Sequence, residues 1–177
     1  MPPLFTHVYA PFVHTCVWRT GEEPTVNVLQ DLEYLLSDLD IARDFYILKG
    51  WPLLLSTLAH DKSRPLRSLA AHCIGNAVKN QEEFHDWAVA KGPGDKDVLE
   101  VVLDAIKEEV GGGAPGGGGF LVKLVYAAGS LLRGNPVASH RFVELGGGDV
   151  VGSLLKVRSR CMAFRAAREL RGTSSED

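Results

Sequence analysis

A run of glycines is the first stretch of this chain with the residue types of a cofactor site. Residues 111–116, Gly-Gly-Gly-Ala-Pro-Gly, satisfy the dinucleotide-binding pattern G-x-G-x-x-G. That pattern binds a pyrophosphate only where a strand precedes it inside a β-α-β unit. Here the charged residues Lys107-Glu108-Glu109, which read as the end of a helix, come directly before it. We therefore expect no cofactor, and no Gly-Lys-Ser or Gly-Lys-Thr of a phosphate-binding loop follows.

Side chains that could bind a metal or act as a nucleophile are present but poorly spaced. His72 and Cys73 are adjacent on a predicted helix, where neighbouring side chains point about 100° apart. His60 and His85 fall in other predicted elements. Ser130 lacks the second glycine of a nucleophile elbow and is better explained as core packing. The residues predict no metal site and no catalytic residue, so an enzyme that uses the glycine-rich loop ranks last among the hypotheses.

A basic cluster near the C-terminus could meet an acidic surface, although a solvated helix face explains it more simply. Its members are Lys156, Arg158, Arg160, Arg165, Arg168 and Arg171. The whole chain has a net charge of −3 and a pI near 6.1. Nucleic-acid binding is not expected, because it requires a basic stripe on a basic domain.

Length and composition indicate one folded domain. The chain has 177 residues, of which 45% are hydrophobic, and its three cysteines, Cys16, Cys73 and Cys161, form no C-x-x-C pair. Residues 1–20 lack the pattern of a secretory signal, and nowhere do eighteen uncharged apolar residues run together. We expect a soluble monomer in a reducing compartment, with no membrane segment.

The elements that would position a site repeat along the chain. A short helix ending in glycine, a second helix and a longer third helix form one unit, and the closing glycines are Gly50, Gly92 and Gly146. If residues 111–119 are a flexible insertion, the period is near 42 residues, within the 40–47 typical of armadillo-type repeats. The predicted fold class is all-α, an armadillo-like α-solenoid of about three repeats.

The expected organisation is an irregular N-terminal arm over residues 1–24, a repeat domain over 25–171 and a polar tail over 172–177. Asp40 is expected to cap a helix that Gly50 ends in a left-handed conformation. Asn135, followed by Pro136, is the strongest helix start in the chain. Asp149 can cap a helix over residues 150–157, and residues 160–170 would begin one more long helix.

Apolar spacing of three and four residues predicts the core. The predicted inward side chains of the second long helix are Leu66, Leu69, Ala70, Cys73, Ile74, Ala77 and Val78. Those of the helix over 97–109 are Val98, Val101, Val102, Ala105 and Ile106. Leu53, Leu54, Leu55 and Leu58 are expected in the core, and Phe142, Val143 and Leu145 complete the last short helix.

With these repeats in view, the chain resembles the armadillo-type nucleotide exchange factors of the heat shock protein 70 chaperones. These comprise the cytosolic Fes-type and HspBP-type proteins and the Sil-type of the endoplasmic reticulum. The likeness covers roughly residues 28–155. It rests on residues 32–45 leading to Gly50, on residues 69–80, and on residues 130–136 with 141–147.

The resemblance implies a curved helical clamp that binds the chaperone's nucleotide-binding domain and hastens ADP release, without catalytic residues. The third helix of each armadillo repeat lines the concave side. The implied partner-binding residues are Asn76, Lys79, Asn80, Arg133 and Asn135, with capping the alternative role for Asn135. The resemblance also implies a cytoplasmic protein, or one of the endoplasmic reticulum if a signal segment is missing from this start.

The alternative is a generic armadillo scaffold that holds another peptide or protein in its groove. A scaffold of the nuclear-import type would place Trp and Asn one turn apart along the long helices. Neither Trp51 nor Trp87 falls in a predicted long helix, which argues against that type.

Overall fold

The computed structural model describes residues 22–79, 82–91, 95–112 and 118–156. In these ranges the chain is helical apart from one isolated bridge between Lys91 and Asp97, which confirms the all-α prediction. The elements are α2 (Glu22–Leu35), α3 (Leu39–Ile47), α4 (Trp51–His60), α5 (Arg64–Val78), the 3-10 helix η2 (Glu82–Val89), α6 (Val98–Gly111), α7 (Gly118–Leu132) and α8 (Pro136–Glu144). One more helix follows over residues 147–156.

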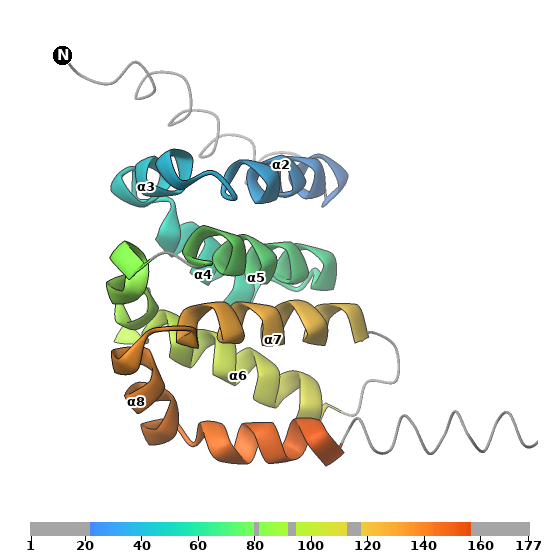
Figure 1. The fold of residues 1–177 in the computed structure, drawn as a ribbon. Coiled ribbons are helices and arrows are strands. Elements are labelled where there is room, and N and C mark those ends of the chain that lie inside the picture. The colour runs from blue at the N-terminus through green and yellow to red at the C-terminus, as the bar shows by residue number, and fades with distance from the viewer. Residues whose placement is uncertain (1–21, 80–81, 92–94, 113–117, 157–177) are drawn as a thin grey trace, which may run out of the picture.

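The helices stack in the armadillo-like order that the repeat predicts. One repeat consists of α3, α4 and α5, and the next of η2, α6 and α7. A third begins with α8 and the helix over 147–156. The long helices α2, α5 and α7 lie side by side in one layer, with α4 and α6 behind them (Figure 1). Each long helix ends on the side where the next short helix begins.

Capping confirms some predicted helix starts and corrects others. Asn135 caps α8, since its Oδ1 accepts a hydrogen bond of 3.0 Å from the Ala138 N–H. Asp40 is not a cap: Asp38 holds that position and accepts from the backbone N–H groups of Asp40 and Ile41. The reason is that α2 ends at Leu35, and the turn after it leaves Asp38 extended, at φ −88° and ψ 131°.

Two other predicted helix starts are too late. The helix predicted from residue 150 already begins at 147, and Asp149 lies in its first turn, with its N–H donating to Gly146 O. Likewise α2 begins at Glu22 rather than Thr25, so residues 22–24 do not belong to an irregular arm. The remainder of that arm lies outside the described residues, as do the tail and the helix predicted over 160–170.

The prediction for Gly50 is wrong in its mechanism. The left-handed residue is Lys49, at φ 63°, whereas Gly50 has φ −72°. Gly50 is required instead because a Cβ there would lie 2.3 Å from the Phe45 ring. The same geometry recurs at Gly147, whose Cβ would lie 2.2 Å from the Phe142 ring. The repeat pattern matches Gly50 to Gly146, but the shared contact with a phenylalanine ring shows that its structural equivalent is Gly147.

The short helix predicted over residues 81–90 is the 3-10 helix η2 (Glu82–Val89), and two of its aromatic side chains stack on one another. Residues three apart lie on one face of a 3-10 helix. Phe84 and Trp87 stack at 3.7 Å between ring centroids. On its other side, Trp87 stacks on Tyr46 of α3 at 4.2 Å.

The predicted core is largely confirmed. All seven predicted side chains of α5 and all five of α6 are buried. So are Leu54, Leu55 and Leu58 of α4, whereas Leu53 is half-buried. Val143 of the last short helix, α8, is 74% exposed. In the described chain no helix is long and apolar enough to cross a membrane.

Candidate partner-binding face

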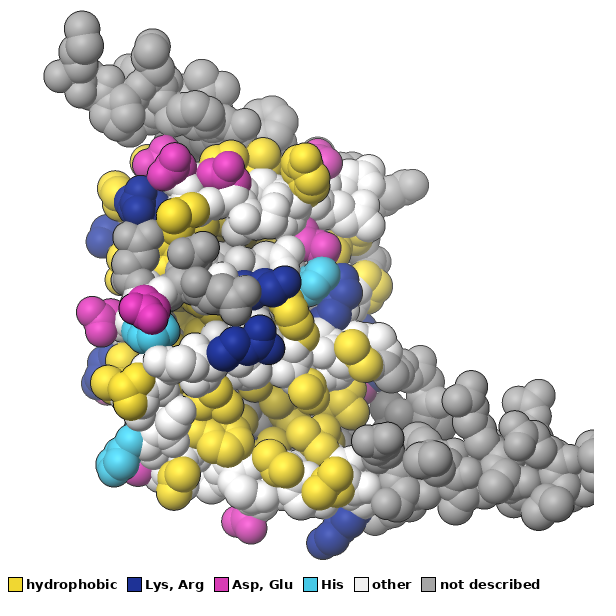
Figure 2. Space-filling view, in the orientation of Figure 1, with side chains coloured by type: hydrophobic (Ala, Val, Ile, Leu, Met, Phe, Trp, Pro, Cys, Tyr) yellow, Lys and Arg dark blue, Asp and Glu magenta, His cyan; other side chains and the backbone are white. Residues whose placement is uncertain are grey.

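The long helices α2, α5 and α7 form one face of the molecule, on which the sequence places its candidate contacts. Figure 2 shows this face with lysine and arginine side chains gathered over its middle and acidic ones over its α2–α3 edge. Helices α2 and α5 are in contact, and so are α5 and α7. The three helices expose polar groups in neighbouring rows.

A polar network crosses this face and ties the three helices together. Glu33 of α2 lies between two partners, with Oε1 2.8 Å from His72 Nδ1 and Oε2 3.5 Å from Lys123 Nζ. The His72 ring meets the Tyr126 ring edge-on at 5.1 Å between centroids. Side chains from α2, α5 and α7 thus fix the spacing of the helices, and each is only partly exposed.

Asn76 completes the network and has both ends of its amide engaged. Its Nδ2 donates to Glu33 O at 3.1 Å, and its Oδ1 accepts from the Tyr126 hydroxyl at 2.8 Å. Since a buried acceptor or donor left unpaired costs about 1–3 kcal/mol, these bonds hold the face in shape. Asn76 therefore supports the face from within, whichever partner the face binds.

Lys79 and Arg133 lie at corresponding places on adjacent helices and are exposed. Lys79 is the C-terminal cap residue of α5, and Arg133 follows the last residue of α7. A cation at a helix C-terminus is favoured by the helix dipole. A cavity of about 150 Å³ opens beside Lys79. It is lined by Leu36, Ser37, Leu39, Asn76, Ala77 and Lys79.

The other two sequence candidates contribute differently. Asn80 lies outside the described residues. Asn135 is 2% exposed, and besides capping α8 its Nδ2 donates to His85 O at 2.9 Å. It joins α8 to η2 and has little surface to offer a partner. The structure thus brings Lys79 and Arg133 to one edge of the face, supported by Asn76, and places Asn135 beneath it.

Sequence reasoning missed Glu33, Lys123 and Tyr126, and considered His72 only as a metal ligand. A signal was present for one pair. Matching Gly75 to Gly129 in the repeat places His72 and Tyr126 at equivalent positions. Polar or aromatic residues repeated at one position of successive long helices indicate a shared surface row.

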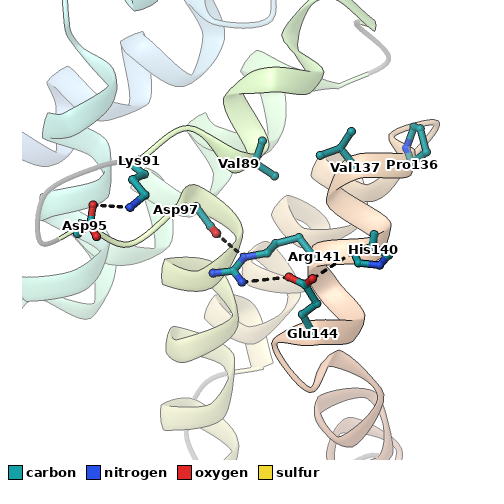
Figure 3. A pocket seen from close by; sticks show the side chains of 9 residues that line it. All are labelled: Val89, Lys91, Asp95, Asp97, Pro136, Val137, His140, Arg141 and Glu144. Atoms are coloured by element: carbon teal, nitrogen blue, oxygen red, sulfur yellow. Dashed lines mark hydrogen bonds and ion pairs between the residues drawn. The ribbon is translucent and has the colours of Figure 1, made fainter.

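A second groove, of about 770 Å³, lies between α8 and the segment that joins η2 to α6 (Figure 3). It is lined by Val89, Lys91, Asp95, Asp97, Pro136, Val137, His140, Arg141 and Glu144. Arg141 Nε donates to Asp97 Oδ2 at 2.8 Å, and its Nη1 to Glu144 Oε2 at 3.2 Å. The pKa of Arg141 is raised by the hydrogen bond to Asp97 first and then by that to Glu144.

The charges of this second groove hold helices together. Asp97 also caps α6 by accepting from the Glu100 N–H at 2.7 Å, so one carboxylate fixes a helix start and binds α8 through Arg141. Lys91 pairs with Asp95 at 2.6 Å within the same connection. The charged side chains of this groove connect α6 of one repeat to α8 of the next, and we assign the groove a structural role.

Cys73 and the histidines form no metal site in the described structure, where no group of three or more His, Cys, Asp or Glu could hold an ion. Cys73 is fully buried, with its Sγ 3.6 Å from Leu29 O. Burial, and next the charge of Glu33, raise the pKa of its thiol. A protonated, inaccessible thiol is unreactive, so Cys73 is a core residue.

Curated relatives of the chain are nucleotide exchange factors. The chain is 26% identical over 152 residues to the Hsp70 nucleotide exchange factor FES1 of Saccharomyces cerevisiae, which covers 82% of this chain and 49% of FES1. It is 28% identical over 127 residues to FES1 of Eremothecium gossypii, covering 71% of this chain and 40% of that protein. No family profile matches the chain.

Another relative of the chain, with a different name from the FES1 proteins, is the nucleotide exchange factor SIL1 of Xenopus laevis. It is 28% identical over 134 residues, which covers 76% of this chain and 27% of SIL1. The chain therefore spans half or less of the length of these relatives. The resemblance found in the residues is confirmed by these similarities over most of the chain.

Proposed function

We propose that this chain, a relative of the FES1- and SIL1-type exchange factors, binds the nucleotide-binding domain of an Hsp70 chaperone and promotes ADP release. The observation that carries the proposal is the similarity to exchange factors over 71–82% of the chain. The armadillo-like stacking supports it, because a layer of parallel long helices offers a continuous face for a folded partner.

The proposed contact surface is the C-terminal edge of the α2–α5–α7 face, with Lys79 and Arg133 as its exposed cations. Two cations on adjacent helices would meet acidic groups on the partner. Because both are solvent-exposed, they should act mainly on the association rate and weaken as salt rises. Asn80 remains a proposed contact on sequence grounds. Asn76 and Asn135 would act by holding the surface in shape.

The mechanism requires no catalytic residue. An exchange factor that binds the open form of the nucleotide cleft more tightly than the closed form shifts the chaperone towards the open form. The shift can be no larger than the difference in affinity between the two forms. The chain would then act in the compartment of its chaperone, the cytosol for a FES1-like role and the endoplasmic reticulum for a SIL1-like role.

Release of labelled ADP from a purified Hsp70 tests the proposal. We expect the chain to accelerate release, and Lys79→Glu with Arg133→Glu to reduce this acceleration at least about tenfold, since each lost charged contact is worth roughly 1 kcal/mol. The matched control is Lys62→Glu with Lys156→Glu, which reverses two exposed lysines elsewhere with the same change in net charge.

An unchanged release rate with the parent chain would contradict the proposal and leave the generic armadillo scaffold. Equal losses in both double variants would show that net charge, rather than this edge, is recognised. Far-ultraviolet circular dichroism of each variant confirms that helix content is retained.

A further inference from the structure

A strip of apolar surface near the end of the helical stack lacks the cover that equivalent residues have in the first repeat. The strip consists of Val122, Val125 and Gly129 on α7 with Val151 and Leu155 on the helix over 147–156. The four side chains are 65%, 43%, 45% and 58% exposed, in that order. Figure 2 shows hydrophobic side chains gathered over these two helices.

Gly129 is the first sign that a helix belongs on the strip. Its equivalent in the repeat is Gly75 of α5, which is buried under α7: a Cβ there would lie 2.6 Å from the Tyr126 ring and 3.2 Å from Ala127 Cα. A Cβ on Gly129 would meet nothing within 4 Å among the described residues. The chain thus keeps a glycine that permits close helix packing at a position where no described helix packs.

Val151 and Leu155 give a second, independent sign. When Gly147 is matched to Gly50, these residues correspond to Leu54 and Leu58 of α4, which are both 0% exposed. In that repeat α4 packs against the long helix α5. The element absent from the last repeat in the described structure is therefore its long third helix.

We propose that residues 159–171 of this chain cover the strip as that third helix. Ser159-Arg160-Cys161-Met162 parallels Ser63-Arg64-Pro65-Leu66, where Ser63 caps α5, and Ala166-Ala167 parallels Ala70-Ala71 at the same separation of 96 residues. The described helix reaches Lys156, three residues before Ser159. So short a tether gives this segment a large concentration advantage over a second copy of the chain.

Docking of this segment would add a fourth long helix to the partner-binding face. The segment contains four arginines and one acidic residue, Glu169. Arg168 then occupies the repeat position of His72 and Tyr126. The four arginines of this segment would extend the row of cations that begins with Lys79 and Arg133, although docking itself does not depend on the proposed function.

Substitution of Gly129 in the full chain tests the proposal through the sign of its effect. If a helix packs closely on Gly129, Gly129→Leu lowers the Tm by about 4 °C or more, because the side chain overfills the contact. In a second full-length background, Ala166→Pro prevents the helix. There the strip is open, and Gly129→Leu leaves the Tm unchanged or raises it, because leucine favours a helix interior over glycine. The same Tm change in both backgrounds would overturn the proposal.

Val125→Ser is the second variant, with Val143→Ser as its matched control on α8. Both valines are exposed in the described structure. Val125→Ser should lower the Tm in the parent background and have less effect with Ala166→Pro, whereas Val143→Ser should be nearly neutral in both. Equal, small effects of the two substitutions would contradict coverage of the strip.

Hydrogen exchange and molecular mass identify the occupant. Backbone amides of residues 162–170 should exchange at least tenfold more slowly than in the Ala166→Pro chain. Exchange at the rate of an unstructured peptide would overturn the proposal. So would a dimer that Val125→Ser dissociates, because a second copy of the chain would then be the occupant.

Discussion

Two positions of this chain require glycine because an aromatic ring lies against each of them. Gly50 and Gly147 each lie against the phenylalanine five residues earlier, so that a Cβ would overlap the ring. Neither needs a positive φ: Gly50 has φ −72°, and the left-handed residue is the one before it in both copies, Lys49 and Gly146. At both positions glycine allows the chain to pack closely against the ring at the end of the short helix.

Gly50→Ala should therefore destabilise the chain although its backbone angles suit alanine. We expect a loss of about 1–3 kcal/mol, because the Phe45 ring must move out of its place in the core. Chemical denaturation measures it. Phe45→Leu should relieve the overlap, so the two substitutions should be less than additive. Gly148→Ala, where a Cβ meets nothing within 4 Å, is the control and should not lower stability.

Asn76 shows how a surface residue can serve the fold. Asn76→Ala removes the acceptor of Tyr126 and the donor to Glu33 O, and should cost about 1–3 kcal/mol of unfolding free energy. Lys79→Ala, three residues later and exposed, should cost less than about 0.5 kcal/mol. Urea titrations of both variants give this comparison. A larger loss for Lys79→Ala would contradict the assigned roles.

At the scale of elements, the start of α5 clamps the end of α6 and the start of α7. Arg67 binds both oxygens of Glu108, at 2.6 and 3.3 Å, and Arg64 pairs with Glu109. The guanidinium carbons lie 5.3 and 5.9 Å from the ring centroid of Phe120. These contacts hold the two helices that flank residues 113–117 independently of that segment.

The Glu108 pair predicts a pH dependence. The hydrogen bond from Arg67 lowers the pKa of Glu108. The folded state then binds fewer protons than the unfolded chain. The stabilisation is therefore complete above the pKa of an unfolded glutamate, about 4.3, and is lost as pH falls through the lower folded value. Because the Glu108 side chain is 65% exposed, it amounts to less than about 1 kcal/mol.

Urea unfolding at pH 7 and pH 3 checks this. Glu108→Gln should lower stability at pH 7 and match the parent more closely at pH 3. Arg67→Gln should remove the same pH-dependent difference, and the double variant should add nothing to it. A difference between Glu108→Gln and the parent that grows as pH falls would show that the pair does not stabilise the fold.

At the scale of the whole molecule, the stacked repeats would couple binding of a partner to the state of its nucleotide. If the chain prefers the open form of the chaperone, then ADP must weaken binding of the chain by the same factor as the chain weakens binding of ADP. Removing nucleotide from the Hsp70 should therefore strengthen binding in titration calorimetry. Equal affinities with and without ADP would contradict an exchange role even if the two proteins bind.

Much of the fold could be predicted from residue types and spacing. Apolar residues at intervals of three and four specify which side of each helix is buried, because this depends only on helix geometry, and α5 and α6 agree at every predicted position. The cap at Asn135 was predictable because its bond is local. Asp38 was missed because the end of α2 is decided by how α2 packs on α5.

The candidate site, like the fold, was predictable from the sequence only in part. The sequence by itself determined a helical repeat and the cations at the ends of its long helices, since these follow from spacing along one chain. Only the tertiary structure decided that Asn76 is bonded to Glu33 and Tyr126, and that Gly50 fits beneath Phe45. It also decided that Gly75, the repeat equivalent of Gly129, is covered by α7. Such contacts join atoms from separate helices, and their distances depend on how whole helices pack.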